Sequence, residues 1–403
     1  MLIVQKFGGT SVGDLDRIQN VANRVQQTVN EGNQVVVVVS AMSGETNKLI
    51  GYAEHFSATP SVADVDMLLS SGERVTASLL SIALNQMGHP TVSMTGRQAG
   101  IVTTSRHTKA RIENIDPVNM QNMLKAGKII VVAGFQGVSE DGLVTTLGRG
   151  GSDLSAVAIA GALKADLCEI YTDVDGIYTT DPRIEPKAKK LDKISYEEML
   201  ELASLGAKVL QNRSVEMAKK LNVNLVTRSS FSDAEGTLIT KEENIMEQPL
   251  VSGVALDRNQ ARVSLIGVVD RPGVAAEIFN ALADEEINVD VILQTVAHDG
   301  TTNIDFTIPT NELENARVIV KTFIDKNEIK STDFNESIAK VSIVGVGMKS
   351  HAGVAAKAFS TMAAENINIR MISTSEIKVS MVIEEKYSEL AVRALHNAFD
   401  LDK

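Results

Sequence analysis

The apolar residues of positions 1–245 follow two alternating patterns, one typical of buried strands and one typical of helices. Continuous apolar runs predict strands at Leu2–Gln5, Gln34–Ser40, Thr91–Met94, Ile129–Ala133, Leu167–Thr172 and Asn224–Arg228, the last being the final strand of this region. Helical spacing predicts helices at Ile18–Val29, at Val62–Gly88 with a break at Ser70–Glu73, and at Pro117–Ala126, Asp153–Leu163, Tyr196–Leu205 and Ala207–Leu221. Strands that alternate with helices indicate an α/β fold, with a mostly parallel sheet sandwiched by helices.

The last third of the chain contains an internal repeat. Arg271–Ile292 and His351–Ile372 align without a gap at an offset of 80 residues, and ten of the 22 paired positions are identical. Each copy follows an apolar strand and continues through a helix, two strands and a second helix. This βαββα order predicts two ferredoxin-like α+β domains.

The second copy lacks the last strand of a complete ferredoxin-like sheet, because its closing helix, Tyr387–Phe399, nearly reaches the end of the sequence. The first copy can be completed by Ser331–Ser337. A spare strand-like segment, Leu250–Leu256, precedes the first copy. We therefore predict that this segment completes the sheet of the second copy, so that the first domain is threaded into the second. The alternative is that it extends the first domain or packs on the preceding one.

These patterns divide the chain into residues 1–245, then 246–337 with the linker, the spare strand and the first small domain, then 338–403 with the second. The charged stretch Lys241–Pro249 reads as the linker, and Met246 within it is a candidate start for a shorter product. A net charge of −12 argues against a nucleic-acid partner. The one cysteine, Cys168, lies in an apolar run, which fits a buried strand and a reducing, cytoplasmic setting. The longest purely aliphatic run, Val35–Val39, is too short to span a bilayer, so we expect no membrane association.

Candidate chemistry first appears where the first strand ends, at Lys6-Phe-Gly-Gly-Thr-Ser11. A glycine turn between a strand and a helix can direct backbone N–H groups at an anion, and Lys6 adds a positive charge. An ordinary βα turn would use the same residues, since Gly-Gly before Thr-Ser is also good capping chemistry. By itself the motif leaves both readings open.

A second glycine loop, Leu147-Gly-Arg-Gly-Gly-Ser-Asp153, directly precedes a predicted helix that Ser152 or Asp153 would cap. Arg149 is placed to hold a carboxylate or phosphate through two hydrogen bonds. Two separate Gly-Gly loops, one with Lys and one with Arg, favour a site of phosphoryl transfer. Ser40 and Thr46, at and after the end of the second strand, are candidates for phosphate or substrate contact, and their alternative role is to cap the next helix. Glu73 comes just after Gly72, where a new helix would begin, and an acid there usually only complements the helix dipole.

Both loops, together with Tyr171-Thr-Asp-Val-Asp-Gly-Ile-Tyr-Thr-Thr-Asp-Pro182, resemble the signatures of aspartate kinases. These enzymes have the amino-acid-kinase fold followed by two ACT domains, which the internal repeat resembles. The resemblance covers essentially the whole chain and is closest to the branch without a dehydrogenase extension. One departure is Lys349-Ser-His-Ala352 in the second copy, where the first has Arg271-Pro272, so an effector site there would differ or be lost.

The resemblance implies a role for each candidate residue. For ATP, with Mg²⁺ carried by the nucleotide and no metal site of the protein's own, it implies Lys6, Phe7, Gly8, Gly9, Ser40, Thr172, Asp173, Tyr178, Arg183 and Lys208. For L-aspartate it implies Thr46, Glu73, Arg149, Gly150, Gly151 and Ser152, and for catalysis Lys6, Arg149, Asp153 and Lys208. For an amino-acid effector, lysine or threonine or both, we expect contacts at Asp270, Gly273, Ala275, Asn288, Gln294, Asn368, Thr374 and Ser375.

The implied reaction is phosphorylation of the aspartate side chain to 4-phospho-L-aspartate, the first step towards lysine, threonine and methionine. The carboxylate is already ionised at neutral pH, so the reaction needs positioning and charge neutralisation and no general base. Two other functions stay open: a kinase for glutamate or acetylglutamate, and a sensor that binds amino acids without catalysis. We also expect a homo-oligomer formed through the ACT domains, with a shorter ACT-only subunit as a further possibility.

Overall fold

The computed structural model describes residues 1–204, 209–245, 249–296, 300–326 and 328–403, which form two compact units. The first contains Met1–Ile177, Lys190–Ala203 and the described part of 208–247. The second contains Tyr178–Lys189, Ser204 and the described part of 248–403. Lys208 and Met246, two residues singled out above, lie outside the described residues.

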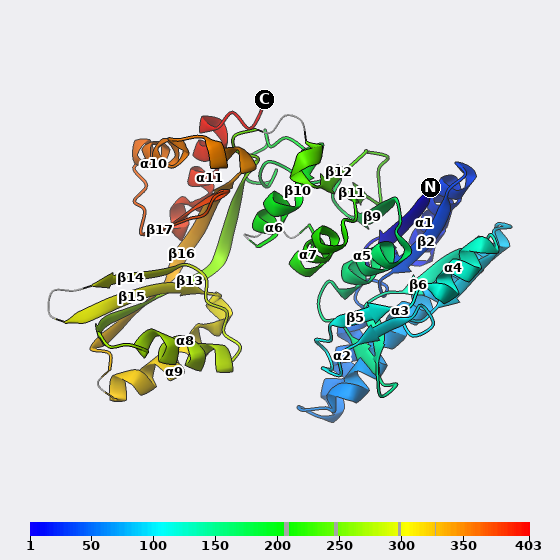
Figure 1. Cartoon of the computed structure of the whole chain (residues 1–403), viewed down its shortest axis with the longest axis horizontal. Coiled ribbons are helices and arrows are strands. Elements are labelled where there is room, and N and C mark those ends of the chain that lie inside the picture. The colour runs from blue at the N-terminus through cyan, green and yellow to red at the C-terminus, as the bar shows by residue number, and fades with distance from the viewer. Residues whose placement is uncertain (205–208, 246–248, 297–299, 327) are drawn as a thin grey trace. The chain divides into compact units, whose positions relative to one another are not determined.

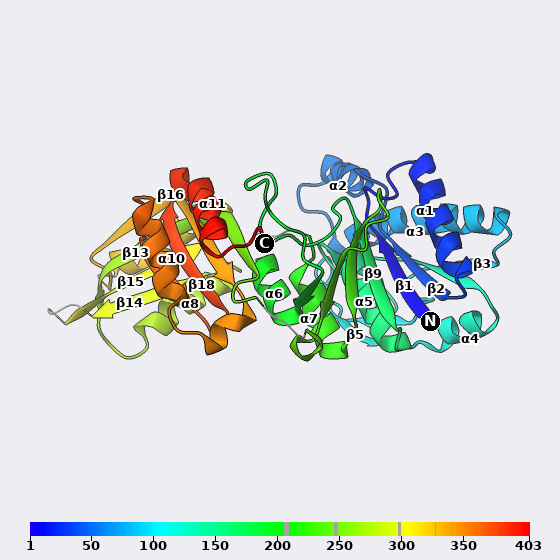
Figure 2. The same ribbon diagram turned by 90° about the horizontal axis from the view of Figure 1, so that it is seen from above.

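The first unit is built on an eight-stranded sheet, and Figure 2 shows β9, β1 and β2 side by side near its middle. All neighbouring strands are parallel except β11 and β12, which are antiparallel. The order is β10 (Lys193–Ser195), β12 (Thr237–Thr240), β11 (Leu225–Ser229), β9 (Leu167–Thr172), β1 (Leu2–Phe7), β2 (Gln34–Val39), β6 (Ile129–Ala133), β3 (Thr91–Met94). The prediction that the strand near Asn224 is the last one was wrong, because β12 folds back on β11.

Helices cover both faces of this sheet, as the continuously apolar strands require. Val35, Val37 and Val39 of β2 pack with α1 (Leu15–Asn30) and α3 (Val62–Gln86) in one core cluster. The intervening Val38 points to the other face, where it lies beside Ser152 of α5 (Gly151–Leu163). The remaining helices are α2 (Glu45–Phe56), α4 (Val118–Lys125), α6 (Tyr196–Ser204) and α7 (Asn212–Leu221). Cys168 is fully buried in β9, as predicted.

Helix α3 runs without a break, so the prediction of an interruption at Ser70–Glu73 was wrong. The hydroxyls of Ser70 and Ser71 donate to backbone carbonyls three residues earlier, which satisfies them inside the helix. Gly72 is needed for close packing, since a Cβ there would lie 2.8 Å from the Cβ of Ala41. Glu73 is consequently inside a helix and not at a helix start.

A four-stranded sheet lies beside α3 and contains strands that the apolar pattern did not predict. Its order is β5 (Ile112–Ile115), β4 (Ile101–Thr103), β7 (Gln136–Ser139), β8 (Val144–Thr146). These strands are only three or four residues long and partly polar, so they carry little period-2 signal.

The second unit contains one antiparallel six-stranded sheet. Its order is β14 (Ile292–Val296), β15 (Thr301–Ile308), β13 (Gly253–Val269), β16 (Ser331–Val344), β18 (Lys378–Glu384), β17 (Met371–Thr374). Helices α8 (Val274–Asp284) and α9 (Leu313–Asp325) belong to the first small domain, and α10 (Val354–Ala364) and α11 (Ser388–Ala398) to the second.

The threading prediction is confirmed by the pairing of β13 with β16. Gly253–Asp257, at the start of β13, pairs with Lys340–Val344 of the second domain, and Val251 and Val254 lie in that domain's core. The later part of β13 pairs with Ser331–Asn335 in the first domain. The segments predicted as four separate strands are therefore two long strands, β13 and β16. One half of each strand belongs to the first ACT-like domain and the other half to the second.

Tyr178–Lys189 belongs to the second unit although it follows β9 of the first. Its Thr179 carbonyl accepts a hydrogen bond of 2.7 Å from Val254 N, and its Oγ1 lies 2.9 Å from His396 Nε2. No feature of the sequence indicated this excursion.

Candidate active site

The strand register brings the ends of β1, β2, β6 and β9 to the same edge of the large sheet. Phe7 is opposite Val39 on one side and Tyr171 on the other, and Val39 is opposite Ala133. Gly8, Ser40 and Gly134, which follow three of these strands, and Thr172, the last residue of β9, therefore meet at one edge. In open α/β sheets this carboxyl edge is where ligands bind.

The glycine turn after β1 is held by the backbone of its neighbours. Gly8 N donates 3.3 Å to Tyr171 O, and Ser11 N donates 2.9 Å to Gly8 O. A Cβ on Gly9 would lie 3.1 Å from the Ala41 carbonyl oxygen, so a side chain would disturb the loop that follows β2. The turn thus keeps a compact backbone next to the end of β2.

Lys6 and Asp153 form a buried ion pair at this edge. Lys6 Nζ lies 2.5 Å from Asp153 Oδ1, and the two side chains are 10% and 12% exposed. The Lys6 amine also lies next to the glycine turn, because a Cβ on Gly8 would be only 3.3 Å from Nζ. The pair joins the first glycine loop to the first turn of α5, two segments that the sequence separates by more than a hundred residues.

The second glycine loop leads into α5, whose N-cap residue is a glycine and so has no side chain to cap the helix. Gly150 is the N-cap residue at φ 69°, and it has no side-chain hydrogen bond to the helix. The prediction that Ser152 or Asp153 caps the helix was therefore wrong. The beginning of α5 points towards the Lys6 region, where an uncapped helix start favours an anion. Arg149, just before it, has an exposed side chain, and its carbonyl accepts a hydrogen bond from Gln211 Nε2.

Glu73 is buried in α3 with one carboxylate oxygen engaged and one not. Oε1 accepts a 3.1 Å hydrogen bond from Ala41 N, in the loop after β2. Among the hydrogen bonds of the described residues, Oε2 is buried without a partner. Burial raises the pKa of the Glu73 carboxyl to about 7, and the hydrogen bond from Ala41 only partly opposes this rise. A cation placed at Oε2 would satisfy it and favour the ionised form.

The loop after β9 is tied to the first glycine loop through a serine that the sequence analysis missed. Ser230 N donates 2.8 Å to Thr172 O, and its Oγ lies 2.5 Å from Ser11 Oγ. Thr172 Oγ1 donates to Asp173 Oδ1, and Asp173 is exposed. Thr172 and Asp173 thus lie at the same edge as Gly8.

Other predicted residues are placed differently. The Phe7 side chain lies in the core, stacked on Tyr171, so only its backbone reaches the edge, where its carbonyl accepts from Ser40 N. Thr46 is half-buried in the first turn of α2. Tyr178 and Arg183 belong to the second unit, where Arg183 is exposed and pairs with Asp181.

The predicted effector residues lie on the surface of the second unit. Gly273 is the N-cap of α8 at φ 95°, and Ala275 is half-buried in the first turn. The others, Asp270, Asn288, Gln294, Asn368, Thr374 and Ser375, are exposed. Gln294 lies in β14 and Thr374 in β17, the two edge strands of the six-stranded sheet.

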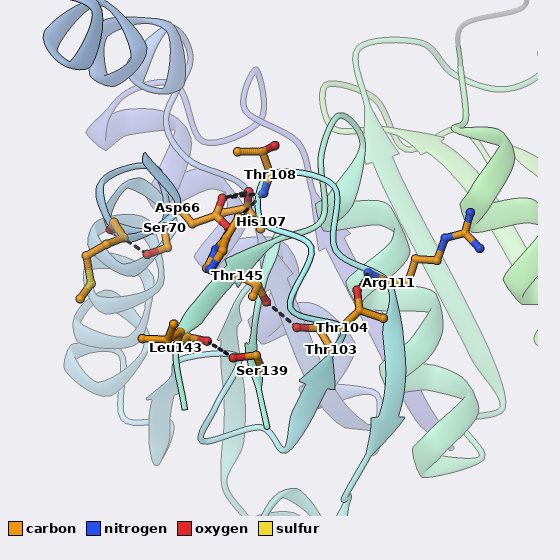
Figure 3. Close-up of polar contacts among 12 residues, drawn as sticks. Asp66, Ser70, Thr103, Thr104, His107, Thr108, Arg111, Ser139, Leu143 and Thr145 are labelled. Carbon is orange, nitrogen blue, oxygen red and sulfur yellow. Dashed lines mark hydrogen bonds and ion pairs between the residues drawn. The ribbon is translucent and has the colours of Figure 1, made fainter. Parts of the chain in front are cut away.

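Asp66, to which no motif of the sequence pointed, is fully buried in α3. It accepts hydrogen bonds from Thr108 N and Thr146 Oγ1 and lies 2.7 Å from His107 Nδ1, as Figure 3 shows for Thr108 and His107. A lone Asp in an amphipathic helix carries no recognisable signal, because its partners are 41 to 80 residues away.

Comparison with known families defines the class of protein. Residues 1–228 match the amino acid kinase family, and residues 263–323 and 341–399 each match the ACT domain. The fold and the site thus define an amino acid kinase joined to two ACT domains.

The relatives narrow this class. The aspartokinase of Helicobacter pylori strain J99 is 59% identical over 407 residues, covering 100% of both chains, and that of Pseudomonas aeruginosa is 57% identical, covering 100% of this chain and 98% of its own. The structure of Escherichia coli aspartokinase III in complex with aspartate and ADP is similar with a TM-score of 0.82 at 28% identity, over 99% of each chain. The chain belongs to the aspartokinase family. The resemblance stated from the sequence motifs is thereby confirmed. Among the described residues, no helix has the length and apolar character needed to cross a membrane.

Proposed function

We propose that this protein transfers the γ-phosphoryl group of ATP to the side-chain carboxylate of L-aspartate, yielding 4-phospho-L-aspartate and ADP. A β-carboxylate oxygen attacks the γ-phosphorus, the bond from that phosphorus to the bridging oxygen breaks, and its electron pair leaves with ADP. The observation that carries this proposal is the buried Lys6–Asp153 pair, set between the glycine turn after β1 and the uncapped start of α5.

The phosphates would lie along this edge of the sheet. Gly8, Gly9 and the backbone of Phe7 would allow close approach, Lys6 would supply positive charge, and Ser40 would add a hydroxyl. Asp153 holds the amine of Lys6 at the edge, so that the amine can turn to the transferring group with little reorganisation. Mg²⁺ would arrive on the nucleotide and neutralise phosphate charge. Thr172, Asp173, Tyr178, Arg183 and Lys208 stay proposed nucleotide contacts.

L-aspartate, which accepts the phosphoryl group, would be held by two side chains of opposite charge. Glu73 Oε2, buried and without a hydrogen-bond partner among the described residues, is a suitable acceptor for the α-ammonium group. Arg149, exposed beside the start of α5, is suited to the α-carboxylate. Thr46, Gly150, Gly151 and Ser152 would complete this subsite. The β-carboxylate would then face the γ-phosphoryl group, and no general base is needed.

The second unit would bind an end-product amino acid and couple it to catalysis. The Escherichia coli relative has also been crystallised with lysine and aspartate, and its structure is similar with a TM-score of 0.79. We propose lysine, threonine or both as effectors, bound where edge strands β14 and β17 meet strands of another copy. Homo-oligomerisation, a cytoplasmic location, the domain limits at 245 and 337, and an ACT-only subunit stay proposals.

Trapping the product with hydroxylamine tests the reaction directly, because only an acyl phosphate gives a hydroxamate. We expect a hydroxamate from L-aspartate with ATP and Mg²⁺, and none from L-glutamate or N-acetyl-L-glutamate. Arg149→Ala should raise KM for aspartate with little change in KM for ATP. Arg149→Lys should raise KM for aspartate nearly as much, since a lysine ammonium cannot make the two parallel hydrogen bonds of a guanidinium group. A hydroxamate from glutamate, or none from any candidate, would contradict the proposal.

A further inference from the structure

Two strained turns flank the loop that carries Arg149. Among the described residues, seven that are not glycine have positive φ, and five of these follow the ends of helices. The remaining two are Thr108 at φ 63° and Phe135 at φ 69°. A β-branched residue such as Thr is rarely found in this region, and strain of this kind accumulates at functional sites.

Both strained residues contact the approach to Arg149. Phe135 O accepts a 2.9 Å hydrogen bond from Leu147 N. Thr108 O would lie 3.2 Å from a Cβ on Gly148, so the Thr108 turn packs directly on the residue before Arg149. The backbone is therefore fixed at the two positions that lead into Arg149.

Asp66 holds the Thr108 turn in its strained conformation. Thr108 N donates to both carboxylate oxygens, at 3.1 and 3.0 Å, and the neighbouring His107 Nδ1 lies 2.7 Å from Oδ2 (Figure 3). Asp66 also accepts a 2.5 Å hydrogen bond from Thr146 Oγ1, at the end of β8 and three residues before Arg149. The buried carboxylate of Asp66 thus ties both the Thr108 turn and the end of β8 to α3.

The same helix carries Glu73, two turns further along. We infer that Asp66 is a positioning residue for aspartate binding, because it fixes the Arg149 loop to the helix that presents Glu73. Binding a substrate by its ammonium and carboxylate requires a fixed spacing between the two groups that hold it. This inference rests on the proposed roles of Arg149 and Glu73.

Asp66→Asn is the direct test, since it keeps the size of the side chain and replaces one acceptor oxygen with a donor. Thr108 N and His107 then compete for fewer acceptors. We expect KM for aspartate to rise about tenfold, as expected for the loss of one hydrogen bond to a charged group, with KM for ATP within about twofold of wild type.

The matched control is Glu198→Gln. Glu198 is also a buried carboxylate of the first unit, and it accepts from Ser195 N and Oγ at the start of α6. Glu198→Gln should lower the thermal midpoint of unfolding about as much as Asp66→Asn does, and it should leave KM for aspartate unchanged. A parallel rise of KM for aspartate in both variants would show that Asp66 only stabilises the fold, which would overturn the inference.

Rescue by Thr108→Gly provides a readout that a purely structural role would not move. Glycine adopts the left-handed conformation without strain, so the turn then needs less support from Asp66. We expect KM for aspartate to be at least about threefold lower in the double variant Asp66→Asn/Thr108→Gly than in Asp66→Asn alone, because the two neighbouring residues are coupled. No recovery would overturn the inference.

If Asp66→Asn does not fold, Thr146→Val removes one of the same hydrogen bonds with little change in shape, and KM for aspartate should rise about threefold to fivefold, as for one lost hydrogen bond. An unchanged KM would again overturn the inference. Failure of this inference differs from failure of the proposed function: in the first case Arg149→Ala still raises KM for aspartate, and in the second it does not.

Discussion

The unusual state of Glu73 makes the effect of Glu73→Gln predictable. Glu73 is 3% exposed, and burial raises the pKa of its carboxyl from an ordinary 4.5 to about 7. The folded protein therefore holds this proton more tightly than the unfolded chain between pH 4.5 and 7. In that window the free energy of unfolding must fall as pH rises, because the folded state binds more protons.

The size of the effect follows from the two pKa values. A difference of about 2.5 pH units corresponds to about 3 kcal/mol, reached in full above pH 7 and absent below pH 4.5. Glu73→Gln keeps an acceptor for Ala41 N and has no ionisation to suppress. We expect it to be more stable than wild type by up to about 3 kcal/mol at pH 8, and of equal stability near pH 4.5.

Hydrogen exchange of the β1 and β2 amides, followed by mass spectrometry between pH 5 and 8, measures this difference within the first unit. The same variant should raise KM for aspartate, since the ammonium loses its partner. In wild type KM should fall as pH rises from 6 to 8, as Glu73 ionises. A variant with the same pH dependence of stability and of KM as wild type would refute the reasoning.

The other predictions concern the transferring group and the regulatory unit. Lys6→Ala should lower kcat far more than it raises KM for aspartate, by about a hundredfold or more, because its charge acts on the transferring phosphoryl group; steady-state kinetics would decide, and interchanged effects of Lys6→Ala and Arg149→Ala would contradict the two roles. Calorimetry should show binding of lysine or threonine to the full-length protein, with an affinity that aspartate and nucleotide change reciprocally; no binding of lysine, threonine or methionine at millimolar concentration would contradict effector control.

Much of the fold could be predicted because its signals are local. The apolar runs of β1, β2, β6 and β9 are visible in a few residues each, and so are the glycines that follow β1 and precede α5. The threading of the two ACT-like domains could also be predicted, because the second copy of the repeat lacked its last strand and the strand-like segment Leu250–Leu256 had no sheet of its own. The excursion of Tyr178–Lys189 could not, because its anchor is a hydrogen bond between Thr179 and a histidine 217 residues away.

The sequence by itself determined the alternation of strands and helices, the repeated domain, and the residue types that a phosphoryl-transfer site needs. Only the tertiary structure decided that Lys6 pairs with Asp153, that Glu73 lies inside an unbroken helix with one oxygen unpaired among the described residues, and that Asp66 ties both the Thr108 turn and the end of β8 to α3. The physical reason is the range of the interactions. Strand and helix patterns arise between residues close in sequence, whereas burial, pKa shifts and strained turns depend on partners that only the folded chain brings together.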